Sequence, residues 1–125
     1  IRIGTNHAEV IGTTDITDSN WHHVAIVLFG GEQADLSTHI LIYIDGKLEK
    51  TSKKSIAKVF TELNHPKSKP LTMGKNIAFN NPKNTKQHYR FFKGWLDEVY
   101  IFDSALNEKQ ISRLITSNTV NEITE

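Results

Sequence analysis

The chain has 125 residues, a net charge of +1 and no cysteine, which excludes disulfides, thiolate metal sites and cysteine nucleophiles. Hydrophobic residues make up 38% of it, enough for one packed domain, and no apolar run approaches the ~18 residues of a membrane-spanning helix. It begins at Ile1 without a signal peptide, so we expect a mature, excised or truncated piece of a longer protein.

The first half of the chain predicts antiparallel strands joined by turns. The strand over 21–29 is apolar on both faces from Val24 onward, which indicates a central strand covered on both sides. Asp45-Gly46 lies between two extended runs and favours a two-residue hairpin turn, because both residues can adopt positive φ. The strands are expected at residues 1–4, 9–13, 21–29, 40–44 and 47–52, with a turn at Asp18-Ser19-Asn20 before the third.

The second half predicts fewer strands and one long loop. Residues 75–88 are polar and rich in asparagine, and a loop of this length in a compact domain is either functional or mobile. Short strands are expected at residues 71–73, 89–92 and 95–102, the last two being separate or joined in one strand that bends at Gly94.

One helix is expected from Asn107 to about Thr116. Asn107 suits the N-cap position, and Gln110 takes the partner position of a capping box. Leu106 and Ile111 occupy the two positions of a hydrophobic staple, which fixes the direction in which the chain enters a helix.

The order of these elements predicts the fold class. Many antiparallel strands with hairpin turns, one short helix and no alternation of strand and helix favour an all-β fold, an antiparallel β-sandwich. We expect one domain over residues 1–117 and a tail or linker over 118–125, where apolar periodicity is weak.

Four segments resemble, in the same order, the motifs of LamG-like, concanavalin A-like jelly rolls. They are NWHHVA at 20–25, LIYIDGK at 41–47, FKGWLDEVYIF at 92–102 and SALNEKQI at 104–111. The resemblance implies a concanavalin A-like jelly roll in which Trp21 and Tyr43 pack in the core. Only twenty residues precede Trp21, so it also implies a domain that lacks the usual N-terminal strands.

The sequence lacks the carboxylate pattern of related glycosidases. Laminarinase-type enzymes that share this jelly roll use a Glu-x-Asp-x-Glu strand, which sets a nucleophile and an acid on one face. Asp97 and Glu98 are adjacent, so on a strand they would face opposite sides. We therefore expect no enzymatic activity. His22 and His23 are also adjacent and show no metal-binding spacing, which favours structural roles for both.

Asp97 is the candidate metal ligand. The resemblance implies that an Asp at this place in the last long strand can bind a structural Ca²⁺ together with backbone carbonyls. The chemistry fits, because Ca²⁺ prefers carboxylate and carbonyl oxygens. The alternative is an Asp that accepts backbone N–H hydrogen bonds or pairs with a lysine.

Basic residues are concentrated in one stretch of the chain. Residues 47–93 hold twelve lysines and arginines and two acids, a net charge of +10, whereas the rest of the chain carries −9. One interpretation is a set of solvated edges and loops, where lysines prevent sheets from pairing. The other is a surface that faces an anionic ligand.

Aromatic and polar side chains around the long loop form the candidate ligand-binding site. Sugar rings stack their apolar faces on aromatic side chains, while Asn and Lys reach hydroxyl and acid groups. The alternative is that at least half of the aromatics in this region belong to the core. The candidate residues are Asn80, Asn81, Lys83, Lys86, Tyr89 and Trp95.

Two functions fit these observations. The first is a non-catalytic carbohydrate-binding or adhesion module of an exported multidomain protein, located outside the cell, in the periplasm or at the cell surface. Its partner is then a polysaccharide or other glycan, an anionic one if the basic stretch binds it. The second is a structural or protein–protein interaction jelly roll, whose partner is another protein or the rest of its parent chain. We expect no nucleic-acid binding and no membrane insertion.

Overall fold

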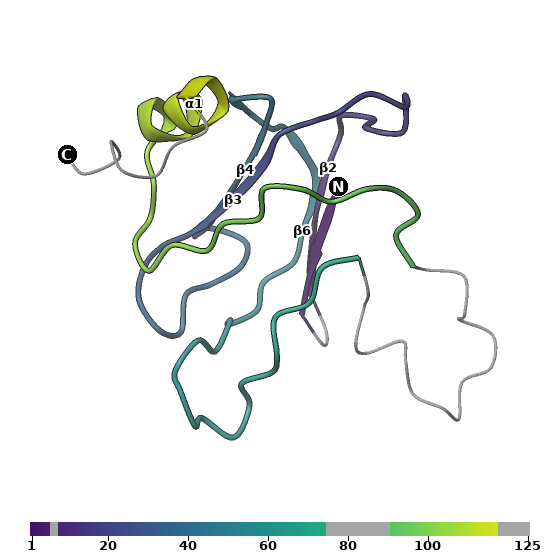
Figure 1. The fold of residues 1–125 in the computed structure, drawn as a ribbon. Coiled ribbons are helices and arrows are strands. Elements are labelled where there is room, and N and C mark those ends of the chain that lie inside the picture. The colour runs from purple at the N-terminus through teal and green to yellow at the C-terminus, as the bar shows by residue number, and fades with distance from the viewer. Residues whose placement is uncertain (6–7, 75–90, 118–125) are drawn as a thin grey trace.

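Two antiparallel sheets and one helix make up the fold, as Figure 1 shows. The computed structural model describes residues 1–5, 8–74 and 91–117. One sheet has the order β1-β2-β6 and the other β3-β4-β5. The elements are β1 (Arg2–Gly4), β2 (Glu9–Gly12), β3 (Val24–Leu28), β4 (Ile40–Ile44), β5 (Lys47–Leu48), β6 (Thr51–Lys54) and α1 (Glu108–Ser117). The predicted β-sandwich with one short C-terminal helix is confirmed. In the part of the chain that the structure describes, no helix is long and apolar enough to cross a membrane.

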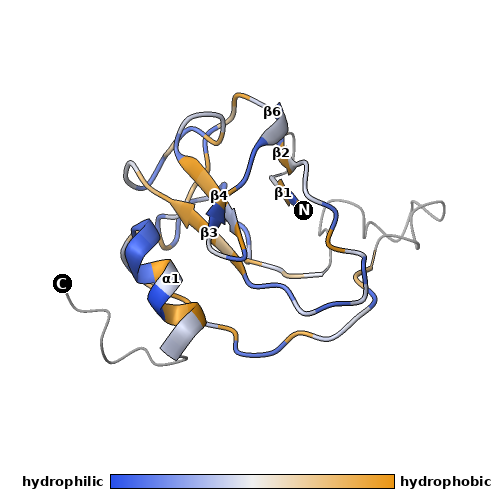
Figure 2. Ribbon diagram, turned by 90° about the horizontal axis from the view of Figure 1, so that it is seen from above, coloured by the Kyte–Doolittle hydropathy of each residue, from blue (hydrophilic) through white to orange (hydrophobic). Residues whose placement is uncertain are grey.

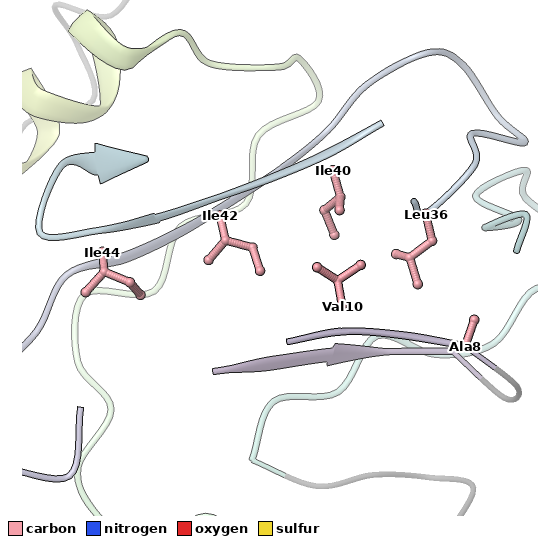
Figure 3. Close-up of a cluster of buried hydrophobic side chains, with 6 residues drawn as sticks. All are labelled: Ala8, Val10, Leu36, Ile40, Ile42 and Ile44. Carbon is pink, nitrogen blue, oxygen red and sulfur yellow. The ribbon is translucent and has the colours of Figure 1, made fainter. Parts of the chain in front are cut away.

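The larger core lies between the two sheets. Alternate residues of β4 point toward β2, because successive side chains of a strand face opposite sides. Figure 3 shows Val10 of β2 beneath Ile40 and Ile42, with Leu36 and Ala8 at one end of the cluster. Val24 and Leu28 of β3 pack against the same cluster from the side.

A smaller core lies on the opposite face of β4. Tyr43 packs there with Val27 of β3 and with Ile111 of α1, which is fully buried. Leu41 and Leu106 pack against these three residues. The sheet of β3 and β4 therefore lies between α1 and the other sheet, an arrangement that Figure 2 shows from above.

The hairpin between β4 and β5 matches the sequence prediction. Asp45 has a φ of 51° and Gly46 a φ of 78°, so both central residues of the turn are left-handed, as a two-residue hairpin of this kind requires. Tyr43 pairs with Leu48 and Ile44 with Lys47. The burial of Tyr43 confirms its predicted place in the core.

The strand that follows the hairpin turn is shorter than predicted. The expected strand over 47–52 divides after Leu48, and Thr51 begins β6, which pairs with β2 of the other sheet. Glu49 and Lys50 span the crossing, where the chain leaves one sheet for the other. The sequence pattern over 47–52 does not show that the pairing strand changes from β4 to β2, because both β5 and β6 are polar and largely exposed.

The strand predicted over 21–29 begins only at Val24. Both faces of β3 contact apolar clusters, but Ile26 is 49% exposed, so the expected cover is incomplete. The central strand of the three is β4 rather than β3. Trp21 precedes the strand and is 69% exposed, so its predicted core position is wrong. Here the Asp45 carboxylate accepts hydrogen bonds from the His22 ring and from the His23 backbone N–H, and the Asp45 N–H donates to the His23 carbonyl.

The strands predicted at 71–73 and 95–102 do not form. The chain at 95–102 is irregular and largely exposed, and the predicted continuation at Phe91 and Phe92 is irregular as well. Glu98 adopts a φ of 50°, which interrupts an extended run, and its N–H donates to the side chain of Asp97. Local hydrogen bonds therefore outweigh the alternating pattern of apolar residues. Residues 89 and 90 lie outside the described part of the chain.

The helix forms as the sequence predicts. Asn107 Oδ1 accepts a hydrogen bond from the Gln110 backbone N–H at 3.0 Å, and Gln110 Oε1 accepts one from the Asn107 N–H at 2.9 Å. These reciprocal bonds are the expected capping box. Leu106 and Ile111 belong to the same apolar cluster, as a hydrophobic staple requires.

We predict that two substitutions in this helix have different costs. Asn107→Ala removes the cap and should lower the free energy of unfolding by about 1 kcal/mol. Ile111→Ala leaves a cavity against Tyr43 and should lower it by about 2–4 kcal/mol. Urea unfolding followed by circular dichroism measures both. The exposed Lys109 supplies the control, because Lys109→Ala should change little. Small and equal effects at Asn107 and Ile111 would contradict docking of α1 on the sheet.

Candidate functional site

Most of the predicted ligand-binding residues lie outside the described part of the chain. These are Asn80, Asn81, Lys83, Lys86 and Tyr89, so they remain predictions. Trp95 is described and is 85% exposed, which leaves its ring free of the core. The described residues on either side of positions 75–90 are in contact, because the Phe92 N–H donates to the Gly74 carbonyl at 2.8 Å. Gly74 has a φ of 71°, and a Cβ there would lie 2.9 Å from that of Phe92.

Asp97 lies in the irregular segment and not on a strand. Its Oδ1 accepts a hydrogen bond from the Glu98 N–H at 2.9 Å, the alternative role that the sequence left open. Glu98 in turn accepts a hydrogen bond from the Tyr100 hydroxyl at 2.6 Å, which raises the pKa of Tyr100. Among residues 1–5, 8–74 and 91–117, no three His, Asp or Glu side chains are grouped so as to hold a metal ion. A calcium site formed by Asp97 and backbone carbonyls stays a prediction.

His22 bridges two carboxylates that lie on different turns. Its Nδ1 is 2.8 Å from Asp45 Oδ2 and its Nε2 is 2.9 Å from Asp18 Oδ1. Both acceptors are carboxylates, so both ring nitrogens act as donors and the ring is an imidazolium. The hydrogen bonds to Asp45 and Asp18 raise the pKa of His22. This bridge ties the predicted turn at 18–20 to the hairpin turn at 45–46.

The ring of His23 has different surroundings from the ring of His22. Its backbone N–H donates to Asp45 Oδ1 at 2.9 Å, and its carbonyl accepts from the Asp45 N–H. Its ring Nδ1 is buried without a hydrogen-bond partner among the described residues, and burial lowers the pKa of His23. The two adjacent histidines thus have structural roles, one charged and one packed.

Glu49 joins the ends of the two sheets. Its Oε1 accepts from the backbone N–H groups of Thr13 at 2.5 Å and Thr14 at 2.6 Å, and its Oε2 accepts from the Thr14 hydroxyl at 2.6 Å. These donors favour the ionised form and lower the pKa of Glu49 to about 2. Gly12 leaves room for this carboxylate, because a Cβ there would lie 2.8 Å from Oε1.

A hollow opens where the chain crosses between the sheets. Its volume is about 360 Å³, at the small end of the range for ligand sites. Asp45 and Glu49 line it, but His22, His23, Thr13 and Thr14 already donate to their oxygens. Within the described chain, no carboxylate lies within ion-pair distance of the lining residues Lys47 and Lys50. The lining consists of Thr13, Thr14, Ile44, Asp45, Lys47, Leu48, Glu49 and Lys50.

Sequence reasoning did not find this hollow. Membership of the basic stretch was the only sequence feature that pointed to Lys47 and Lys50 as ligand-binding residues. Nothing in the sequence shows that Thr13 and Thr14 lie beside Glu49, because 35 positions separate Thr14 from it. The hollow depends on the unpredicted division of the return strand into β5 and β6.

Two packed antiparallel sheets place the chain among β-sandwich proteins. Residues 1–112 match the sequence model of the concanavalin A-like lectin/glucanases superfamily, and the chain belongs to this superfamily. The match confirms the resemblance of the four sequence motifs. No curated protein and no solved structure matches the chain.

We predict that Glu49 stabilises the fold in a pH-dependent way. Its folded-state pKa of about 2 lies below the ordinary value of 4.5, so its contribution is complete above pH 4.5 and is lost as the pH falls toward 2. The difference in unfolding free energy between the wild type and Glu49→Gln should therefore be largest near neutral pH and shrink in acid. Urea unfolding from pH 2.5 to 7 measures it.

The exposed Glu32 provides the matched control for this experiment. Its side chain lies away from Thr13 and Thr14, and the same change, Glu32→Gln, should leave the pH profile of stability unaltered. A constant difference between wild type and Glu49→Gln across the pH range would contradict the role of the ionised carboxylate.

Proposed function

We propose that the chain is a non-catalytic carbohydrate-binding or adhesion module of an exported multidomain protein. Membership of the concanavalin A-like lectin/glucanases superfamily carries this proposal, because it suggests carbohydrate binding or adhesion in general. The absence of a Glu-x-Asp-x-Glu segment from the sequence supports a non-catalytic role. Export to the periplasm, the cell surface or the medium is tested by fractionating the source cells, and a wholly cytosolic pool would refute it.

The charge distribution supports an anionic ligand. The net charge is +10 over residues 47–93 and −9 elsewhere, so charge is unevenly distributed along the sequence although its total is small. In the predicted site, Lys83 and Lys86 supply charge while Tyr89 and Trp95 supply faces for stacking on sugar rings. A sulfated or uronic polysaccharide combines these two requirements.

A protein partner is the second candidate, and one observation favours it. Large apolar side chains in the segment before α1 are exposed, an arrangement that suits an interface with another protein or with the rest of the parent chain. The residues are Trp95, Leu96, Val99, Tyr100 and Ile101. Capture of a defined protein partner together with a silent glycan array would favour this function over the first.

A glycan array tests the proposed function directly. We expect binding to acidic polysaccharides that weakens between low and physiological salt but persists in part, because stacking is less screened than charge attraction. Lys83→Glu with Lys86→Glu should weaken this binding without lowering the melting temperature.

The control for this variant carries the same charge change elsewhere. Lys54 and Lys69 are exposed, and the double substitution of both by Glu should keep most of the affinity. If the Lys83/Lys86 variant keeps full affinity for every ligand found, the basic stretch is only a solvated surface.

We also propose a structural Ca²⁺ that Asp97 binds together with backbone carbonyls. A ligand that binds only the folded state raises its stability, so EDTA should lower the melting temperature of the wild type. Asp97→Asn should remove this sensitivity, whereas Asp103→Asn, at an exposed position nearby in sequence, should retain it. A wild type that is indifferent to both EDTA and millimolar calcium would leave Asp97 as a hydrogen-bond acceptor for Glu98.

A further inference from the structure

The hollow beside the β4–β5 hairpin has a particular set of free hydrogen-bonding groups. The carboxylates of Asp45 and Glu49 are occupied by donors from the protein itself. The ammonium groups of Lys47 and Lys50 have no carboxylate partner among the described residues. Lys47 and Lys50 are therefore the charged groups of the hollow that remain open to a ligand, although Asp45 and Glu49 keep their negative charge and the four side chains sum to zero.

The remaining lining suits a sugar ring. The Thr14 hydroxyl donates to Glu49, and the Thr13 hydroxyl lies within hydrogen-bond distance of both Glu49 Oε1 and the Lys50 carbonyl, so the oxygen lone pairs of both threonines can accept hydrogen bonds from a ligand hydroxyl. Leu48 is 57% exposed and provides an apolar surface for the C–H face of a pyranose. The hollow has a volume of about 360 Å³ and is open to solvent, which suits one sugar unit at the end or within a longer chain.

The walls of the hollow are held in place before any ligand arrives. The His22 imidazolium fixes Asp45 from one side, and the Thr14 hydroxyl and backbone N–H fix Glu49 from the other. A site that is already ordered loses less conformational entropy on binding.

We propose that this hollow binds one acidic sugar unit, with Lys47 and Lys50 contacting its carboxylate or sulfate and Thr13 and Thr14 accepting from its hydroxyl groups. The proposal rests on the proposed carbohydrate-binding function and places a site for it outside the 75–90 region. The acidic group is the shared chemistry of uronic and sulfated sugars, and the ligands used below separate the two.

Calorimetry with defined oligosaccharides tests the proposal. The probes are a hexamer of galacturonic acid, the same hexamer with its carboxyl groups reduced, and a heparin-derived hexasaccharide. Each lost charge-assisted hydrogen bond costs roughly tenfold in affinity, so Lys47→Glu with Lys50→Glu should weaken acidic hexamer binding at least tenfold. Lys54→Glu with Lys69→Glu carries the same change of charge and should weaken it about twofold or less. The reduced hexamer should bind weakly to all three proteins.

Three results would overturn the proposal while leaving carbohydrate binding intact. One is an equal loss of affinity in both lysine variants, which would indicate diffuse attraction. Another is full affinity in the Lys47/Lys50 variant, which would place the site elsewhere. The third is equal binding of the reduced hexamer. Circular dichroism and melting temperature confirm that both variants are folded.

Nuclear magnetic resonance separates failure of the hollow from failure of the proposed function. Glucuronate and glucose 6-sulfate, each titrated alone, should shift the backbone amides of Thr13, Thr14 and residues 47–50, and neutral glucose should not. If these shifts appear but the glycan array shows no binding, the hollow binds an acidic sugar unit and the polysaccharide-binding function is rejected. No shift at these amides would overturn the proposal, whatever the array shows.

Discussion

The burial of β4 on both faces is the constraint on which the rest of the structure depends. Ile40, Ile42 and Ile44 close the core between the sheets, while Tyr43 meets α1 through Ile111. A strand buried on both sides cannot slip by one residue, because each side chain would then enter the wrong core. Because β4 cannot shift, the hairpin turn that follows it at Asp45-Gly46 is also fixed in position. At its tip, a Cβ on Gly46 would lie only 3.2 Å from Ile115 of the helix, so α1 and the turn are packed closely.

The fixed hairpin sets the position of the polar groups around it. Asp45 presents its carboxylate to His22 and to the His23 N–H, which holds the chain before β3 against the turn. Two residues separate β5 from β6 of the other sheet, and one of them, Glu49, accepts hydrogen bonds from the two residues that follow β2. The sheets are thus joined by an apolar interface in the middle and by a hydrogen-bonded carboxylate at one end. The hollow lies at that end, where residues 13–14, 44–45 and 47–50 line it.

Local signals in the sequence predicted local structure well. Asp45-Gly46 specifies its turn through backbone conformation, and Asn107 with Gln110 specifies a helix start through hydrogen bonds between near neighbours. Contacts between distant residues were not predictable, as with Glu49 and Thr14. The alternation at 95–102 indicated a strand, but a strand requires a partner, and Asp97 and Glu98 bond locally instead. Five of the six candidate ligand-binding residues lie outside the described chain, so the predicted site remains a prediction.

Charge alone does not distinguish the lysines of the basic stretch, but their surroundings do. Lys53 pairs with Glu9, which Arg2 also contacts, so its ammonium group already has a carboxylate partner. Lys67 lies over the ring of Phe60, with its Nζ 5.4 Å from the ring centroid. Lys47 and Lys50 line a hollow whose carboxylates are occupied by other donors. A binding site for an anion needs cations that are not already paired with a side chain of the protein, and a recess that positions them. Lys47 and Lys50 meet both conditions, which Lys53 and Lys67 do not.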